Sequence, residues 1–244
     1  MYLILGDIHG RTIWKDIIAK EKDFDKVIFL GDYLDPYEKL SPKQIVDNFE
    51  EILKFKQDNS DKVILLTGNH DCSYTKACDD KCRYSPFVQQ IIGDKIGQLI
   101  QDNTLQLCHY LTDADIWVSH AGFTNTWLRH NRLQLNEIEL NNHFKEYVQS
   151  ELNNPYVFQY RNFQTDVYGD NVYQSPMWVR PYSLSIDSPY DVCQIVGHTQ
   201  IENHSDEDIT RVMMCDSLGY NKYYILQDMS LKHMNEWKII QKQY

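Results

Sequence analysis

Side chains that can bind metal ions or phosphate follow five short apolar runs of this chain. The runs occur in the segments LILGDIHG, VIFLGDYLD, VILLTGNHD, IWVSHAG and QIVGHT. Open α/β folds place their ligand-binding residues just beyond the carboxyl ends of parallel strands. The pattern therefore predicts a parallel sheet with one polar site at its edge. The residues brought to that edge would be Asp7, His9, Asp32, Asp35, Asn69, His70, His120 and His198.

Six of these residues suit a site for two divalent metal ions. Asp7 and His9 are separated by one residue, so in extended backbone both side chains project from the same side and can chelate one ion. The two carboxylate oxygens of Asp32 can bridge that ion to a second. A mixture of oxygens and imidazoles suits Mn, Fe, Zn or Ni better than Ca or Mg, and two ions about 3.5–4 Å apart serve phosphate-ester hydrolysis. Asn69, His120 and His198 would complete the set of donors with neutral groups.

His70 is expected to have a different role, because it follows Asn69 directly and would point from the same loop toward a leaving group. An imidazole there can donate a proton to the departing oxygen, which typically contributes about 10²–10⁴ in rate. Asp35 could orient the ring by accepting its other N–H. The alternative for Asp35 is an ordinary turn residue before Pro36.

Length, composition and charge indicate one acidic α/β domain over residues 1–244. Of the 244 residues, 42% are hydrophobic, which is enough for a sizeable core without a second domain. The net charge of −11 argues against a nucleic-acid partner, since phosphate neutralisation needs clustered Lys and Arg. We see no signal peptide and no apolar stretch of membrane-spanning length, and therefore predict a cytoplasmic protein with no membrane partner and mostly reduced cysteines.

Alternating strand-like and helical patterns predict a layered sandwich with the order β-α-β-α-β. The first three apolar runs are continuous, as expected of strands buried on both faces. Pro42 behind Ser41 is a helix start signal. Strands are expected near residues 2–6, 26–31, 62–67, 115–119, 192–197, 210–215 and 222–227, and helices near 14–21, 43–58, 87–101 and 136–152.

Two later parts of the chain depart from that order. The last three strands are joined by connections too short for helices, which predicts an antiparallel or mixed second sheet with the site between the sheets. Residues 123–190 are rich in Tyr, Phe, Trp and Asn, and we interpret them as an insertion that caps the site. The alternative is that these aromatic side chains fill a second small core. The segment GDIHGR lacks the spacing of Gly-rich nucleotide-binding loops.

At these motifs the chain resembles the calcineurin-like metallophosphoesterases, and within that superfamily most of all the branch of Ser/Thr protein phosphatases and diadenosine-tetraphosphatase-like enzymes. The motifs GDIHG, GDYLD, GNHD, SHAG and GHT occur in that order over residues 6–199. The resemblance implies a four-layer α/β/β/α sandwich with mixed sheets and a dinuclear metal site at the carboxyl ends of the strands. It also implies direct attack of a two-metal-bound hydroxide on phosphorus, with Mn as the expected metal and Fe, Zn or Ni as alternatives.

The resemblance further assigns a role to each motif residue. His70 would be the catalytic acid, oriented by Asp35. The metal ligands would be Asp7 and His9 for the first ion, Asp32 as the bridge, and Asn69, His120 and His198 for the second ion.

Two positions depart from the family pattern. Protein phosphatases continue with GDYVDRG, whose Arg grips the phosphate, whereas Pro36 occupies that place here. The phosphate-binding cation is therefore expected elsewhere. Arg180, in MWVRPY, is the first candidate because bacterial relatives carry a similar Trp-x-Arg, and Arg11 is the second; an ordinary surface arginine is the alternative for either. Gln200 stands where many phosphodiesterases of the superfamily have a second His, which favours a phosphatase.

Three cysteines, Cys72, Cys78 and Cys82, follow the GNHD motif closely. They could bind zinc with one further ligand, or form a redox-sensitive disulfide near the site. Their irregular spacing favours ordinary reduced thiols.

The leading prediction is a metal-dependent hydrolase of phosphate monoesters or phosphoanhydrides. Its substrate would be a phosphorylated small molecule, a nucleotide or a phosphoprotein. Two alternatives stay open: a phosphodiesterase or nuclease of the same superfamily, and a catalytically silent binding scaffold with this fold. The motifs leave the substrate, the native metal and the oligomeric state open.

Overall fold

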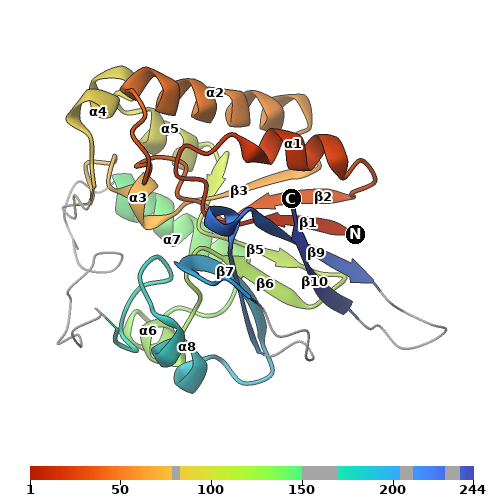
Figure 1. Cartoon of the computed structure of the whole chain (residues 1–244). Coiled ribbons are helices and arrows are strands. Elements are labelled where there is room, and N and C mark those ends of the chain that lie inside the picture. Colours follow the sequence, from red (N-terminus) through yellow and green to blue (C-terminus); the bar gives the residue numbers. More distant parts are fainter. Residues whose placement is uncertain (79–82, 150–169, 204–210, 229–236) are drawn as a thin grey trace.

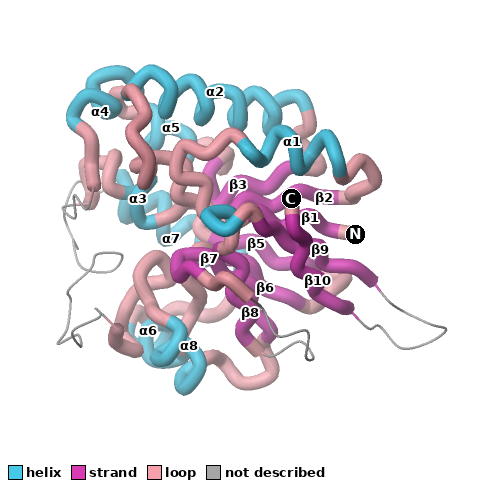
Figure 2. The backbone as a smooth tube through the Cα atoms, in the orientation of Figure 1, coloured by secondary structure: helices cyan, strands magenta, loops and turns pink. Residues whose placement is uncertain are grey.

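The computed structural model describes residues 1–78, 83–149, 170–203, 211–228 and 237–244. Two β-sheets pack face to face in the middle of the molecule, and helices cover their outer faces (Figure 1). The tube in Figure 2 shows the same order, with helices above and below two neighbouring layers of strands. This arrangement confirms the predicted α/β/β/α sandwich with mixed sheets.

Within the described residues, the larger sheet combines four parallel strands with two antiparallel ones. Its strands are β1 (Tyr2–Leu5), β2 (Lys26–Phe29), β3 (Val63–Leu66), β4 (Leu105–Gln106), β9 (Lys222–Asp228) and β10 (Trp237–Gln243). Their order across the sheet is β10-β9-β1-β2-β3-β4. Strands β1 to β4 run parallel, so the loops after β1, β2 and β3 lie at the same edge.

The smaller sheet brings two further loops to that edge. Its strands are β5 (Cys108–Leu111), β6 (Ile116–Ser119), β7 (Cys193–Gln200) and β8 (Val212–Asp216), in the order β5-β6-β7-β8. Strands β6, β7 and β8 run parallel, and β5 is antiparallel to β6.

The continuous apolar runs bury alternate side chains on opposite faces of the larger sheet. In β1, Leu3 and Leu5 face the helices, whereas Tyr2 and Ile4 pack against the smaller sheet. Strands β2 and β3 repeat this alternation. Both faces are thus buried, as predicted, and the strand ends that carry the site are held on a rigid core.

Local signals explain where several helices begin and end. The helices are α1 (Ile13–Lys20), α2 (Pro42–Asp58), α3 (Asn69–Cys72), α4 (Pro86–Ile92), α5 (Lys95–Gln101), α6 (Asn125–His130), α7 (Glu137–Gln149) and α8 (Pro181–Asp187), with a 3₁₀ turn at Leu218–Tyr220. Ser41 and Gln44 form a capping box before α2, and Pro42 occupies its first turn. Gly93, with a φ of +56°, separates α4 from α5, so the helix predicted over 87–101 is two helices. Among the described residues, no helix has the length and hydropathy of a membrane span.

The prediction that the last three strands share one sheet is wrong for β9. Strands β7 and β8 pair in the smaller sheet, but β9 crosses to the larger sheet and pairs antiparallel with β1. Tyr224 and Leu226 of β9 join the core between the sheets, which accounts for its place there. Strands β4, β5 and β10 are further additions to the predicted set.

Residues 123–190 contain α6, α7 and α8. Helix α7 packs against α5 and β5, and its side chains Leu140 and Phe144 join the core under the helices. Residues 150–169 lie outside the described part of the chain. The division into one domain with a cap over the site therefore stays a prediction.

Candidate metal centre

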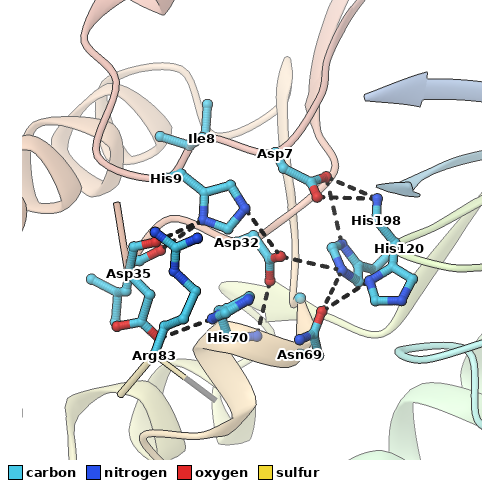
Figure 3. A network of polar contacts seen from close by, with 12 residues as sticks. Asp7, Ile8, His9, Asp32, Asp35, Asn69, His70, Arg83, His120 and His198 are labelled. Carbon is cyan, nitrogen blue, oxygen red and sulfur yellow. Dashed lines mark hydrogen bonds and ion pairs between the residues drawn. The ribbon is translucent and has the colours of Figure 1, made fainter. Parts of the chain in front are cut away.

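All eight predicted site residues lie together at the carboxyl ends of β1, β2, β3, β6 and β7 (Figure 3). Contacts within this cluster join parts of the chain as distant as Asp7 and His198, whose backbone N–H donates to the Asp7 carboxylate at 3.0 Å. The buried members are Asp7, His9, Asp32, Asp35, Asn69, His70 and His120, whereas His198 is partly buried. The sequence pattern thus located the cluster correctly.

Asp32 lies at the centre of the cluster. Its Oδ2 atom is 3.6 Å from Nε2 of His9 and 3.6 Å from Nε2 of His120, while Oδ1 accepts the backbone N–H of His70 at 2.9 Å. One carboxylate oxygen therefore faces two imidazoles, as a bridging ligand would. Within the described residues, two sets of three side chains place ligand atoms within 4.8 Å of one another: His9, Asp32 and His70, and Asp7, Asp32 and His120. Asp7 lies in the set with His120, and His9 lies in the set with His70. Which residues share an ion stays a prediction.

Backbone carbonyls orient two of the imidazoles. Nδ1 of His120 lies 2.8 Å from the carbonyl oxygen of Leu30, and Nδ1 of His9 lies 3.0 Å from that of Asp35. When these Nδ1–H groups donate, Nε2 of each ring presents a lone pair to the site. This is the orientation that a metal-binding imidazole needs.

The remaining donors also fit a divalent metal ion. Oδ1 of Asn69 lies 3.0 Å from Nε2 of His120 and 3.0 Å from Nδ1 of His198. When Nδ1 of His120 donates, its Nε2 is an acceptor, so Nε2 and Oδ1 of Asn69 are two acceptors in contact. A cation between them would remove this repulsion. Nε2 of His198 is buried and has no hydrogen-bond partner in the described part of the chain.

Buried negative charge gives a second reason to expect cations. Burial and the neighbouring Asp216 carboxylate raise the pKa of Asp7. Burial likewise raises the pKa of Asp216 to about 7, although the Arg11 charge lowers it. Within the described residues no Lys or Arg forms an ion pair with Asp7, Asp32 or Asp216. Uncompensated carboxylates in a protein interior are costly, so bound divalent ions would stabilise them.

Asp216 is a site neighbour that the sequence analysis missed. It ends β8, is 1% exposed, and its carboxyl group interacts with that of Asp7. A signal was present, because VMMCD is one more apolar run that ends in a carboxylate.

The pKa separates His70 from the other imidazoles of the site. Burial lowers the pKa of His9 to about 4 and also lowers those of His120 and His198. Burial lowers the pKa of His70 as well, but the Asp32 carboxylate and other acidic neighbours raise it to about 9. Neutral imidazoles suit metal binding, whereas a protonated one suits proton donation.

Asp35 and Tyr74 hold the His70 ring. Nδ1 of His70 lies 3.0 Å from Oδ2 of Asp35, and the Tyr74 hydroxyl donates to Oδ1 of the same carboxylate. The predicted pairing of His70 with Asp35 is therefore present in the structure. Tyr74 was not predicted, because no motif distinguishes it from other buried aromatic residues.

Two glycines and four residues with left-handed backbone conformation let the polar groups converge. Gly68 and Gly197 have no Cβ. A methyl group on Gly68 would collide with the Asp32 carboxylate, and one on Gly197 would collide with the Asp7 carboxylate. Four site residues adopt the left-handed region, which costs energy and is common at functional sites: His9 (φ +44°), Asp32 (+51°), Asp35 (+59°) and His198 (+63°).

The Asp71 carboxylate joins the loop after β2 to the loop after β3. It accepts backbone N–H groups from Asp32 at 2.8 Å, Tyr33 at 2.9 Å and Gly68 at 2.9 Å. Asp71 therefore positions the loop that carries Asp32. The motif GNHD contains this Asp, but nothing in the sequence distinguished its role from that of an ordinary loop residue.

We expect Asp71→Ala to lower the free energy of unfolding by about 3 kcal/mol or more. The substitution leaves three buried N–H groups without an acceptor, and each such loss costs about 1–3 kcal/mol. Urea unfolding of metal-free protein measures the effect, with the exposed Asp58→Ala as control. A loss no larger than that of the control would mean that Asp71 does not hold these loops.

Both predicted phosphate-binding arginines lie next to the cluster. Nη1 of Arg180 donates to the carbonyl oxygen of His198 at 3.5 Å and to Oγ1 of Thr199 at 3.2 Å. Nη1 of Arg11 donates to the carbonyl oxygen of Asp7 at 3.2 Å. Each arginine thus contacts the backbone of a loop that carries predicted ligands.

Two of the three cysteines near GNHD are described. Cys72 and Cys78 are both buried, and no disulfide joins two cysteines within the described part of the chain. Their interaction and burial raise the pKa of Cys72, which disfavours the reactive thiolate. Cys82 lies outside the described residues.

Comparison with known proteins identifies the family. The sequence model of the calcineurin-like phosphoesterases matches residues 2–202. The chain belongs to this family. A search of curated proteins found no match.

Solved structures agree with the family fold. A mutant of a cold-active protein tyrosine phosphatase is 18% identical, with a TM-score of 0.60, and the match covers 91% of this chain and 76% of that one. A protein serine/threonine phosphatase from Saccharomyces cerevisiae is 14% identical, with a TM-score of 0.53 over 100% of this chain and 79% of that one. As a calcineurin-like phosphoesterase, the chain is a metal-dependent hydrolase of phosphate esters, and its family uses divalent metal ions.

Proposed function

We propose that the chain is a two-metal phosphatase that hydrolyses phosphate monoesters or phosphoanhydrides. The observation that carries this proposal is the position of the His70–Asp35 pair. It lies beside Asp32, the carboxylate that faces imidazoles on two sides. A proton donor next to a set of metal ligands is what hydrolysis of a phosphate ester requires.

The proposed ligands are those of the sequence motifs. When bound, divalent ions supply positive charge for the phosphate oxygens and lower the pKa of a bound water. Mn is the metal we propose, with Fe, Zn or Ni as alternatives, because the donors are oxygens and imidazoles. The ligand residues are Asp7, His9, Asp32, Asn69, His120 and His198.

The reaction is the addition of water to phosphorus with loss of the leaving group. The P–O bond to the leaving group breaks, and the ring proton of His70 passes to the departing oxygen. Asp35 keeps the ring oriented and stabilises its positive charge. Arg180 is the proposed cation for the transferred phosphate, with Arg11 as the second candidate, since both already contact ligand loops.

Hydrolysis of matched esters tests the proposal. We expect Mn-loaded protein to hydrolyse p-nitrophenyl phosphate and adenosine diphosphate, and to act on bis-p-nitrophenyl phosphate at least about tenfold more slowly. Faster hydrolysis of the bis-ester would identify a phosphodiesterase. Bound metal without turnover of any of the three would favour a binding scaffold.

A further inference from the structure

One cation near the centre, Arg83, is assigned no role by the motifs. Arg83 is exposed, and Figure 3 shows it on the side of the network that holds His9, Asp35 and His70, away from Asn69 and His198. Arg83 thus lies on the side of the proposed proton donor.

Two contacts fix the Arg83 guanidinium in place. It donates to the carbonyl oxygen of Pro36 at 2.5 Å, next to Asp35 in the chain. Its Cζ atom lies 3.8 Å from the ring centre of Tyr37, within the range of a cation–π contact. A side chain held at both points loses less entropy when it binds an anion.

Tyr37 connects Arg83 to the metal-binding side chains. Its ring meets the ring of His9 edge to face at 4.7 Å, and His9 in turn lies 5.1 Å from His70. Arg11 lies near the same tyrosine, with Cζ 5.6 Å from the ring centre. Two guanidinium groups therefore lie near one ring, and Tyr37 as a whole residue is 54% exposed.

The charge of Arg83 has no acidic partner among the described residues. Its guanidinium carries five N–H donors, and Pro36 is the one hydrogen-bond acceptor that the described residues supply. The remaining donors can bind a phosphate or carboxylate from solution, for which planar guanidinium groups are well suited.

We infer that Arg83 and Tyr37 form a subsite for an anionic leaving group, so that the enzyme prefers phosphoanhydrides to esters with neutral leaving groups. The inference rests on the proposed function, in which His70 protonates the leaving oxygen. Because Arg83 is held beside Asp35, the partner of His70, a second phosphate on the leaving group lies next to this guanidinium. Arg180, on the His198 side, is left for the transferred phosphate.

Arg83→Gln tests this inference by comparing two substrates. We expect kcat/KM for adenosine diphosphate to fall about tenfold to a hundredfold, as for a lost charge-assisted hydrogen bond, while kcat/KM for phenyl phosphate changes less than about threefold. Arg83→Lys is expected to recover part of the loss because it restores the charge. The control is Arg129→Gln, because Arg129 is also exposed and also donates to a backbone carbonyl, that of Asn125.

Two further variants test the tyrosine. Tyr37→Ala removes the ring under the guanidinium and should lower activity on adenosine diphosphate severalfold, about as far as a lost cation–π contact allows. Tyr37→Phe keeps the ring and should retain more of this activity than Tyr37→Ala does. If Arg83→Gln lost kcat/KM equally on both substrates, Arg83 would bind the transferred phosphate. If it lost kcat/KM on neither substrate, Arg83 would not belong to the site. Either result would overturn the proposed subsite.

Binding separates failure of this inference from failure of the proposed function. Calorimetry with Mn-loaded protein should show adenosine diphosphate bound about tenfold more weakly by Arg83→Gln, with inorganic phosphate binding unchanged. If the wild type hydrolyses neither adenosine diphosphate nor phenyl phosphate, the proposed function fails. The binding comparison between wild type and Arg83→Gln still decides whether the subsite exists. If the wild type is active and the variant binds both anions normally, only the subsite is wrong.

Discussion

Replacement of His70 by Asn is expected to lower kcat for phenyl phosphate by about 10²–10⁴ while bound metal is unchanged. The loss follows from the removal of the ring that Asp35 orients and whose proton the leaving oxygen receives. Burial lowers the pKa of this ring, but acidic neighbours led by Asp32 raise it to about 9, so in the metal-free site it carries a proton at neutral pH. Steady-state kinetics and metal analysis on the same preparation measure both quantities.

The leaving group provides the control for His70. The p-nitrophenolate ion is a weaker base than phenolate and needs less help from an acid, so His70→Asn should lose less on p-nitrophenyl phosphate than on phenyl phosphate. Equal losses on the two esters would contradict proton donation. Loss of bound metal in His70→Asn would also contradict proton donation, because it would identify His70 as a metal ligand. The ligand atoms of His9, Asp32 and His70 lie close enough to share one ion.

Replacement of Asp32 by Asn is expected to weaken metal binding and kcat/KM by more than about a hundredfold. Mutation of residues that only support metal ligands typically lowers metal affinity or activity 10- to 100-fold. We expect a larger effect for Asp32 because it directly faces both His9 and His120. Metal-free protein is expected to lose some stability as well, because Asp32 accepts the backbone N–H of His70, and because, although burial raises its pKa, the neighbouring imidazoles hold that pKa below the ordinary value. The effect of Mn is therefore measured against the metal-free form of the same variant. Thermal unfolding should therefore show a large Mn-induced rise in Tm for the wild type and little or none for Asp32→Asn.

Asp47→Asn is the matched control for this experiment. Asp47 is an exposed carboxylate on α2 that pairs with Lys43, and within the described residues it makes no hydrogen bond or ion pair with the eight residues of the cluster. Its substitution should leave the Mn-induced rise in Tm unchanged. If Mn raised the Tm of Asp32→Asn as much as that of the wild type, the ions would bind elsewhere.

The site could be predicted from the sequence because its signals are local. Each of the five motifs places a donor at the end of a buried strand, and parallel strands bring their carboxyl ends to one edge. The alternation that buries Leu3 under the helices and Ile4 between the sheets follows from the same pattern. Asp7 and His198 therefore meet although they are 191 positions apart in the sequence.

Features that depend on long-range packing could not be predicted. The apolar run of β9 is compatible with either sheet, and its pairing with β1 is decided by how Tyr224 packs between the sheets. Arg83 lies in a loop, and its position depends on the carbonyl of Pro36 and the ring of Tyr37. Neither contact leaves a periodic signal in the sequence.

Titration of metal-free protein with Mn²⁺ tests whether hydrolysis depends on two bound metal ions. Protein-bound metal and hydrolysis of p-nitrophenyl phosphate are followed in the same samples. We expect no hydrolysis without metal, and a rise in activity that parallels metal binding and is complete when two ions are bound per chain. Full activity in chelator-treated protein, or saturation with metal without hydrolysis of any phosphate ester, would contradict this expectation.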